Sequence, residues 1–514
     1  MRVLSSFFLQ NGVFTRNPFC LWWIQPLTFN KKTDNIRVRT KMISRIANRI
    51  GTNAVHNALL RDKVYEKLAT WSGDSLPAVG VAIGRLIPSD DENLPFKLEY
   101  TTGVAGNRVD ENALKQIFPD QFDKVDKTQF QALESDKFHL GSCGKAFTNL
   151  LIAELSEHDK SIHGDLTVGE VLPSVRNTWK DIRLVELLSH QAGLDDLLVL
   201  NKIDVKSLSG LGKYFKTAFK QTTKGTFATI SDLWRPYHEE QALYSNLPSK
   251  DRIIKTRHER VLSMLDQHEC DANPKLRGTW KYSNYGYAVA SLLVELKTGK
   301  NFEELIRQHV FDPLGMNSAG FGNCQSPSYV DPSLPDEPQP DLPITQPWGH
   351  YNASSFSVKL VSHAQSELIT VPDLLTPAGN MHASVEDWLR LLSSELILAR
   401  TSPERLYFHK SFGAPLSKRK PNIGYGWGWI IEDHIQKLPP KTDAEPVSLV
   451  SKEPQHQYSL YHSGSDSLWF STCKIDVEKG TVVALVTNAS HLRSLLFLSQ
   501  HLKELEALLL NQKI

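Results

Sequence analysis

The stretch from Gly144 to Leu155, GKAFTNLLIAEL, is apolar almost all the way round a helix from Ala146 onwards. A surface helix carries an apolar stripe, whereas a helix that is apolar on every side must be enclosed by other elements. The chain has 514 residues, of which 40% are hydrophobic and 22% charged, and this is enough to build a large domain around such a helix. We therefore predict a buried central helix at this position.

The flanking segments predict strands and further helices. The stretch 79–86, VGVAIGRL, reads as a strand, and two strands around a short turn fit the segment VAIGRLIPSDDENLPFKLEYTTGVAG. Near the end, LWFSTCKI and TVVALVTNA flank the turn DVEKG, and the amphipathic pattern of 492–510 predicts a closing helix. These elements favour an α+β fold, with an antiparallel sheet flanked by helices and a mostly helical lobe.

The N-terminal segment differs from the rest of the chain in charge. Residues 1–50 hold nine Lys or Arg and one acid, so they carry +8 while the remainder carries −7. A basic, acid-poor leader containing Ser and aromatic residues resembles a mitochondrial transit peptide. The apolar stretch FCLWWIQPLTF has 11 residues, too few to cross a bilayer, so no transmembrane span is expected. Mitochondrial import is the predicted location, and the cytoplasm is the alternative. The alternative interpretation of the segment is a disordered leader, with translation starting at Met42.

The expected organisation is therefore a basic leader over 1–41 and a domain over 42–510. Residues at about 200–275 are polar and helix-prone, which indicates an insertion, and residues 324–347 are rich in proline, which indicates an extended loop. The net charge of +1 gives no support for nucleic acid binding. The five cysteines are scattered without a CxxC pair, so no metal site or disulfide scaffold is expected.

Three Ser-x-x-Lys pairs occur in the chain, and the first lies at the start of the predicted buried helix. Residues three apart on a helix share a face, so Ser142 and Lys145 can meet there. A lysine whose pKa is lowered by burial from about 10.4 can accept the proton of a serine. The N-terminus of a helix also offers N–H groups and a positive dipole end to an anionic oxygen. This pair is the predicted nucleophile and base.

The other two pairs lie in contexts that do not favour this chemistry. Ser417 and Lys420 are expected in a solvated basic loop, LSKRKP. Ser471 and Lys474 lie in a predicted strand, where side chains three residues apart point to opposite faces. Context therefore separates the first pair from the two later ones.

Two residues near these motifs have competing interpretations. Cys143 is next to Ser142 but lies about 100° around the helix from it, away from the face of Lys145, so we predict a small buried thiol. A cysteine nucleophile is the alternative. His190, in LSHQAGL, is expected to be a structural hydrogen-bonding residue, and a catalytic role is its alternative.

Two further motifs follow in order. Tyr282-Ser283-Asn284 leads into YGYAVASLLVEL, a predicted amphipathic helix, whereas a second YSN at Tyr244 runs into a predicted loop. His462-Ser463-Gly464 stands where the C-terminal sheet begins. The ordered set of Ser-x-x-Lys, Tyr-Ser-Asn and His-Ser-Gly resembles the serine beta-lactamase/penicillin-binding-protein superfamily.

Within that superfamily, the chain is most similar to the class C-like group of esterases, D-amino-acid peptidases and mitochondrial beta-lactamase-like proteins. Segments beyond the three motifs have family counterparts in the same order, and the resemblance runs from about residue 60 to 500. These segments are IRLVELLSHQAGL, VFDPLGMNSAGF, PAGNMHASVEDWLRLL and YGWGW. The insertion and the Pro-rich loop have no clear place in the family pattern.

The resemblance implies a role for each motif residue. Ser142 would form an acyl-enzyme, and Lys145 would be its base or would prepare it electrostatically. Tyr282 would relay a proton to the leaving group, and Asn284 would hold Lys145 and the substrate carbonyl. The N–H groups of Ser142 and of Ser465, which follows His462 and Gly464 in the third motif, would form the oxyanion hole. No metal or cofactor is implied.

Two positions depart from the family pattern. Many lactamases and penicillin targets have Lys-Thr-Gly where this chain has His462-Ser463-Gly464, and a mostly neutral histidine puts a preference for anionic acyl donors in doubt. Gly144 stands where threonine is common, and glycine costs about 1 kcal/mol in a helix interior. We expect Gly144 to make room for a neighbouring strand or for substrate.

The sequence thus supports two hypotheses. The first is a serine hydrolase acting on a small-molecule ester or peptide, with esterase or peptidase activity favoured over true beta-lactamase activity. The second is a non-catalytic or dual-role scaffold that retains the fold and forms filaments or another homo-oligomer. Retention of Ser142, Lys145, Tyr282 and Asn284 together favours the first, since a scaffold needs none of them.

Overall fold

The computed structural model divides the chain into two units, Met1–Thr40 and Lys41–Ile514. The part of the chain that the structure describes lies within the second unit. It comprises residues 54–71, 76–89, 96–194, 249–266, 277–324, 344–354, 357–360, 371, 373–401, 414–417, 420–426, 428–434, 458–490 and 492–511.

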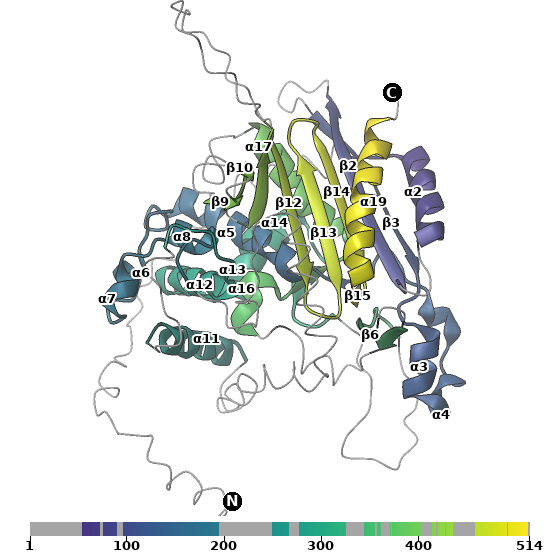
Figure 1. Cartoon of the computed structure of the whole chain (residues 1–514), viewed down its shortest axis with the longest axis horizontal. Coiled ribbons are helices and arrows are strands. Elements are labelled where there is room, and N and C mark those ends of the chain that lie inside the picture. The colour runs from purple at the N-terminus through teal and green to yellow at the C-terminus, as the bar shows by residue number, and fades with distance from the viewer. Residues whose placement is uncertain are drawn as a thin grey trace, which may run out of the picture. The chain divides into compact units, whose positions relative to one another are not determined.

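The main sheet of the described part has nine strands in the order β1-β3-β2-β14-β13-β12-β11-β10-β9 (Figure 1). Its neighbouring strands pair antiparallel, except that β1 runs parallel to β3. The strands of this sheet are β1 (Val55–His56), β2 (Ala78–Pro88), β3 (Phe96–Gly106), β9 (Ala414–Ser417), β10 (Lys420–Gly426), β11 (Trp429–Asp433), β12 (Tyr458–Ser465), β13 (Phe470–Asp476) and β14 (Thr481–Thr487).

Two three-stranded sheets accompany it, in the orders β15-β6-β7 and β4-β8-β5. Their strands are β4 (Phe138–His139), β5 (Gly320–Phe321), β6 (His350–Ser354), β7 (Ser357–Leu360), β8 (Met381–Ala383) and β15 (Ala489–Ser490). In the second of these sheets, β4 ends shortly before Ser142. Leu140, the residue after β4, still donates its N–H to the carbonyl oxygen of Met381 in β8.

The helices of the described part include six of fourteen residues or more that cover the sheet or fill the lobe. The α-helices are α2 (Ala58–Trp71), α3 (Glu111–Ile117), α4 (Pro119–Phe122), α5 (Gly144–His158), α6 (Val168–Val171), α7 (Asn177–Lys180), α8 (Leu184–Leu188), α11 (Ser249–Asp266), α12 (Asn284–Thr298), α13 (Phe302–Ile306), α14 (Asp312–Leu314), α16 (Thr376–Gly379), α17 (Val385–Thr401) and α19 (Leu492–Leu510). The 3-10 turns are η3 (Lys127–Phe130), η4 (Gly141–Cys143) and η7 (Asp373–Leu375), and η6 (Arg307–Phe311) is a π-helical turn.

Alternation along the strands divides the core between the two faces of the sheet. In β2, Val79 and Val81 pack in one hydrophobic cluster with α2 and α19, whereas Ala78 and Ala82 belong to a second cluster with α5, α12 and α17. This is the period of two that a strand buried on both faces requires. Figure 1 shows α19 and α2 lying along the strands on the near side of the sheet.

The predicted buried helix is α5, and it is enclosed as expected. Every residue from Gly144 to Ile152 is buried, and α5 contacts α12, α13 and α16. The predicted hairpins are also present, since Ala78 pairs with Gly106 in β2–β3 and Asp476 with Thr481 in β13–β14. The α+β class, with a sheet flanked by helices, is confirmed.

Other expectations fared differently. Ser417 and Lys420 were expected in a loop, but they close a hairpin as paired residues at the ends of β9 and β10. This expectation is wrong, because both residues belong to paired strands of the main sheet. Most of the insertion, the Tyr244 motif and residues 325–343 of the Pro-rich loop lie outside the described residues, although α11 lies within the insertion and is helical.

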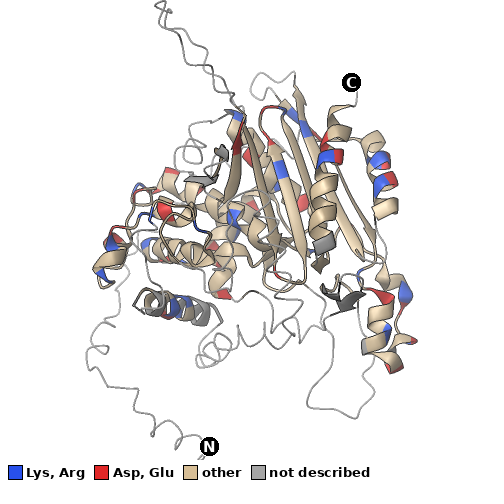
Figure 2. Cartoon of the chain, viewed as in Figure 1, with Lys and Arg blue, Asp and Glu red and all other residues tan. Residues whose placement is uncertain are grey.

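Charged residues are mixed along the described elements. Figure 2 shows Lys and Arg beside Asp and Glu on the same helices, as in α2, whose sequence ALLRDKVYEKLATW interleaves both signs. No helix in the described ranges is long and apolar enough to cross a membrane. The described residues also contain no group of three His, Cys, Asp or Glu side chains placed to hold a metal ion.

Candidate active site

Ser142 lies in the short 3-10 turn η4, one residue beyond Gly141 and just before α5 begins. Gly141 has φ of +50°, and a β-carbon there would collide with the backbone N of Ser465. Gly464 packs in return against the N of Ser142, where a β-carbon would lie 2.7 Å away. The two glycines therefore bring β12 against the turn, and the amides of Ser142 and Ser465 lie on either side of their contact.

The hydroxyl of Ser142 lies between two partners from different elements. Tyr282 donates its phenolic O–H to Ser142 Oγ at 2.7 Å, and Lys145 Nζ lies 3.2 Å from the same oxygen. Tyr282 comes from the segment before α12, 140 residues further along the chain, while Lys145 is the second residue of α5. The structure thus brings these three predicted site residues together around one oxygen atom.

Lys145 is fully buried and donates to three neutral acceptors. Besides Ser142 Oγ, these are Asn284 Oδ1 at 2.7 Å and the carbonyl oxygen of Ala378 at 2.6 Å. Because a neutral lysine has two N–H groups and one lone pair, the two shorter contacts can use both hydrogens and leave the lone pair facing the serine. The same geometry satisfies all three hydrogens of an ammonium, so Lys145 can gain or lose a proton without moving.

Aromatic side chains surround this lysine. The rings of Tyr282 and Tyr287 lie 4.8 Å and 5.3 Å from Lys145 Nζ, a distance at which a cation is attracted to an aromatic face. Burial raises the pKa of Tyr287 and of Tyr425 well above the usual range, so both are neutral phenols beside the site. Tyr287 in turn donates to the carbonyl of Leu188 at 2.9 Å, which ties α12 to the end of α8.

Gly144 has a steric role. A β-carbon on Gly144 would lie 3.0 Å from the Cα of Gly379, so only glycine lets the backbone of α16 approach α5 this closely. Thr148 supports the same contact by donating to Pro377 O at 2.6 Å. Gly144 therefore makes room for a neighbouring helical turn, where we expected a strand or substrate, and the approach places Ala378 O on Lys145.

The Tyr282-Ser283-Asn284 motif lies at the N-terminus of α12, as its sequence predicts. Ser283 caps the helix by accepting the N–H of Gly286 at 3.3 Å, and Gly299 ends it in a left-handed conformation. Gly286 packs against Leu187 O of α8, where a β-carbon would lie 2.9 Å away. The cap and this contact fix the two polar side chains of the motif relative to α5.

His462 lies on β12 as predicted, but its ring is turned into the protein. It is 4% exposed, its Nδ1 lies 2.8 Å from Ser463 O, and its Nε2 lies 3.0 Å from the hydroxyl of Tyr425. Both ring nitrogens are therefore engaged within the protein. A lysine at this position would extend a long flexible cation, which His462 in this geometry does not replace.

Cys143 is 1% exposed and is the last residue of η4. Its Sγ lies 3.2 Å from Ser471 Oγ, whose hydroxyl is closer to Leu140 O at 2.6 Å. Burial raises the pKa of the Cys143 thiol, whereas hydrogen bonds with Cys473 and His462 lower it, with a net fall to about 5. Cys143 is thus enclosed by the protein, whereas its neighbour Ser142 is partly exposed.

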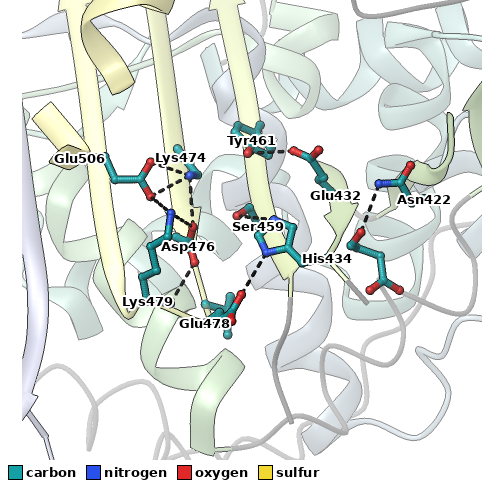
Figure 3. Close-up of polar contacts among 12 residues, drawn as sticks. Asn422, Glu432, His434, Ser459, Tyr461, Lys474, Asp476, Glu478, Lys479 and Glu506 are labelled. Carbon is teal, nitrogen blue, oxygen red and sulfur yellow. Dashed lines mark hydrogen bonds and ion pairs between the residues drawn. The ribbon is translucent and has the colours of Figure 1, made fainter. Parts of the chain in front are cut away.

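The third Ser-x-x-Lys pair is divided by its strand, as predicted. Ser471 faces η4, whereas Lys474 points to the opposite side of β13 and binds Glu506 and Asp476 at 2.7 Å and 3.2 Å. Figure 3 shows this ion-pair cluster, which also includes Lys479 and ties α19 to the sheet.

The motif search missed three functional groups of the site. They are the carbonyl of Ala378 and the phenols of Tyr287 and Tyr425. A backbone carbonyl leaves no trace in residue type, so the only signal was PAGN, which places a turn next to a glycine. The two tyrosines stand in YGYAV and YGWGW, where their spacing does not separate them from ordinary core residues.

The family model described as Beta-lactamase matches residues 125–499, well over half of the chain. Penicillin-binding protein 4* of Bacillus subtilis is 22% identical over 174 residues, and this match covers 31% of the chain and 32% of that protein. The chain thus spans about a third of that curated relative.

Solved structures of other proteins are also similar to this chain. The penicillin binding protein of Bacillus halodurans has 14% identity, a TM-score of 0.50 and coverage of 86% of this chain and 99% of that one. The D-amino acid amidase of Ochrobactrum anthropi SV3 has 15% identity, a TM-score of 0.49 and coverage of 88% and 98%. At 14% identity, the likeness to the penicillin binding protein is one of fold alone.

Proposed function

Because the chain belongs to the beta-lactamase family, we propose that it is a serine hydrolase that forms an acyl-enzyme on Ser142 with an ester or amide substrate. The observation that carries the proposal is the position of Ser142 Oγ, 2.7 Å from Tyr282 OH and 3.2 Å from Lys145 Nζ. A nucleophile within hydrogen-bond reach of a base, with that base oriented by further groups, is the arrangement that nucleophilic catalysis needs.

In the proposed acylation step, Ser142 Oγ attacks the substrate carbonyl and passes its proton to Lys145. Asn284 and Ala378 O hold the amine in place during the transfer. Tyr282 then gives its proton to the leaving oxygen or nitrogen as the carbonyl–leaving group bond breaks, and is reprotonated from Lys145. Water later attacks the ester on Ser142, and its proton returns by the reverse path, which regenerates the free serine.

The developing oxyanion needs donors that are fixed before the reaction. The amide nitrogens of Ser142 and Ser465 both border the contact of Gly141 with Gly464, and we assign them this role. Loss of one oxyanion donor typically costs about 3–4 kcal/mol of barrier. Both donors are backbone groups, so their placement depends on the absence of a side chain at Gly141 and Gly464.

The environment of His462 favours a neutral acyl donor over a beta-lactam. Its ring is engaged with Ser463 O and Tyr425, so it does not offer the extended cation that would pair with a substrate carboxylate. We therefore propose an ester or peptide substrate. The intact contacts of Ser142 also favour chemistry over a scaffold that has lost its activity.

The test is a substrate panel with the full chain and its Ser142→Ala variant. Short-chain esters, D-amino-acid amides, small peptides and nitrocefin are compared by initial rate. We expect turnover of an ester or amide above the level of Ser142→Ala, and little turnover of nitrocefin. Equal rates for the two proteins on every substrate would refute the proposal that the chain is a serine hydrolase acting through Ser142.

A further inference from the structure

His190 follows α8 and holds an unusual backbone conformation. Its φ is +59°, and among the described residues it shares a positive φ with only one other non-glycine residue, Ser467. In this region a β-carbon is unfavourable, so the conformation persists only where surrounding contacts enforce it. His190 is also 2% exposed, which puts a strained, polar residue in the interior.

Two contacts of His190 reach the chain on both sides of Tyr282. Lys281 donates its backbone N–H to the carbonyl oxygen of His190 at 2.8 Å. Ser283 donates its backbone N–H to Nδ1 of the His190 ring at 3.2 Å. The peptide groups that flank Tyr282 are thus both held by one residue, and Tyr282 itself reaches Ser142.

The ring of His190 also packs against the phenol that it helps to place. Its centroid lies 4.4 Å from the ring of Tyr282 and 4.4 Å from that of Tyr425, with Tyr287 at 5.4 Å. Close packing on this side limits rotation of the Tyr282 side chain. The backbone contacts and the ring contact therefore act on the same group.

The contact with Ser283 requires a neutral ring. Since Nδ1 accepts a hydrogen bond, the ring proton is assigned to Nε2, which is buried without a hydrogen-bond partner. Burial lowers the pKa of His190 well below the usual range, and the charges of Lys145 and His462 lower it further. Protonation would remove the acceptor for Ser283 and add a cation beside Lys145.

We propose that His190 is a positioning residue for the proposed reaction, holding Tyr282 at the leaving-group side of Ser142 through Lys281 N–H, Ser283 N–H and the face of the phenol. The inference rests on the proposed function. The inference predicts an effect that depends on the leaving group, because Tyr282 is the proposed proton donor to that group. Loss of His190 slows substrates whose leaving group must be protonated, and spares substrates whose leaving group departs as a stable anion.

The experiment compares an alkyl ester with the p-nitrophenyl ester of the same acid. The variant is His190→Asn, because asparagine tolerates a left-handed backbone and removes the ring that packs on Tyr282, while its Oδ1 can still accept from Ser283 N–H. His190→Gly is the second variant, since glycine removes the strain as well. A burst titration with the p-nitrophenyl ester counts the folded, reactive sites, so a loss of folded protein does not enter the rates.

Per reactive site, His190→Asn should lower kcat/KM for the alkyl ester about tenfold or more, since a misplacement of about 1 Å costs up to about 100-fold. The p-nitrophenyl ester should lose less than about threefold, because its leaving group needs no proton. In the double variant with Tyr282→Phe, the change at His190 should cost nothing further. The control is His309→Asn, a half-buried histidine whose charged neighbours are Lys300 and His158.

The outcomes distinguish a failure of this inference from a failure of the proposed function. Equal losses on the two esters, or additive losses in the double variant, would show that His190 supports the fold and does not act through Tyr282. If wild-type protein gives no burst, or if Ser142→Ala gives the same burst, the proposed function fails and this inference fails with it. A wild-type burst with unchanged His190 variants overturns the inference alone.

Discussion

Two buried lysines, Lys145 and Lys474, each follow a serine by three residues, yet their surroundings differ completely. Lys145 shares a helical face with Ser142 and donates to a hydroxyl, an amide and a carbonyl. Lys474 lies on a strand, faces away from its serine, and is paired with the carboxylates of Glu506 and Asp476 (Figure 3). The spacing is the same, and the secondary structure decides whether the two side chains meet.

The difference in charge is as informative as the difference in geometry. A lysine beside carboxylates is held as a cation, which fastens α19 to the sheet but leaves no proton to move. A lysine among neutral acceptors can exchange its proton with the serine beside it. The comparison therefore supports the proposed catalytic role for Lys145 and a stabilising role for Lys474, and each variant below tests one of these two roles.

The largest expected effect is on activity at the first lysine. Lys145→Met should lower the acylation rate by about 1,000-fold, within the range of 10²–10⁴ for loss of a general base. The reason is that no other group lies at the same place to accept the proton of Ser142. Stopped-flow acylation with a p-nitrophenyl ester measures this rate, and thermal unfolding checks the fold. A loss of less than about tenfold would remove Lys145 from the role of base.

The matching change at the second lysine should affect stability alone. Among the described residues, Lys474→Met leaves Lys479 as the remaining ion-pair partner of Asp476 and Glu506, so the free energy of unfolding should fall by about 3 kcal/mol. Denaturant unfolding measures the loss, and kcat/KM on the folded protein should stay within about twofold. Reduced turnover per folded molecule would contradict the separation of the two clusters.

Gly144→Ala tests whether the position of Ala378 O beside Lys145 matters for acylation. The added carbon would lie 3.0 Å from Gly379 Cα, so α16 must shift and carry Ala378 O away from Lys145. We expect a loss of about tenfold in acylation, or about 1.4 kcal/mol of barrier. The control is Gly84→Ala in β2, where the nearest atom belongs to the flexible side chain of Leu98. Similar kinetic losses in both variants would argue against a special role for the Gly144 contact.

The smallest effect is the pH dependence of the second cluster. Hydrogen bonding from Lys479 and the charge of Lys474 lower the pKa of Asp476 from 3.8 to about 2, despite its burial. A carboxylate with a lowered pKa contributes stability above its unfolded pKa, and this is lost as pH falls from about 4 to about 2. Asp476→Asn removes the contribution, so its deficit in Tm relative to wild type should narrow between pH 5 and pH 2. A Tm deficit that stays constant from pH 5 to pH 2 would show that the ion pairs of Asp476 do not contribute to stability.

The sequence predicts the elements of both regions better than the contacts between them. The all-round apolar pattern of α5, the hairpins and the closing helix follow from local periodicity, and the Ser142, Tyr282 and Asn284 motifs follow from the order of short patterns. The turn η4 was not predicted, because an extension of the helix back to Ser142 fits the pattern equally well. The carbonyl of Ala378 could not be predicted, since it reaches Lys145 across 233 residues through a backbone contact.

The central claim is that Ser142, and not its neighbour Cys143, is acylated. A fluorophosphonate probe applied to wild-type protein, followed by peptide mass spectrometry, identifies the modified residue directly. The account predicts a single adduct on Ser142, no labelling of Ser142→Ala and normal labelling of Cys143→Ala. An adduct on Cys143, or labelling that survives in Ser142→Ala, would contradict it.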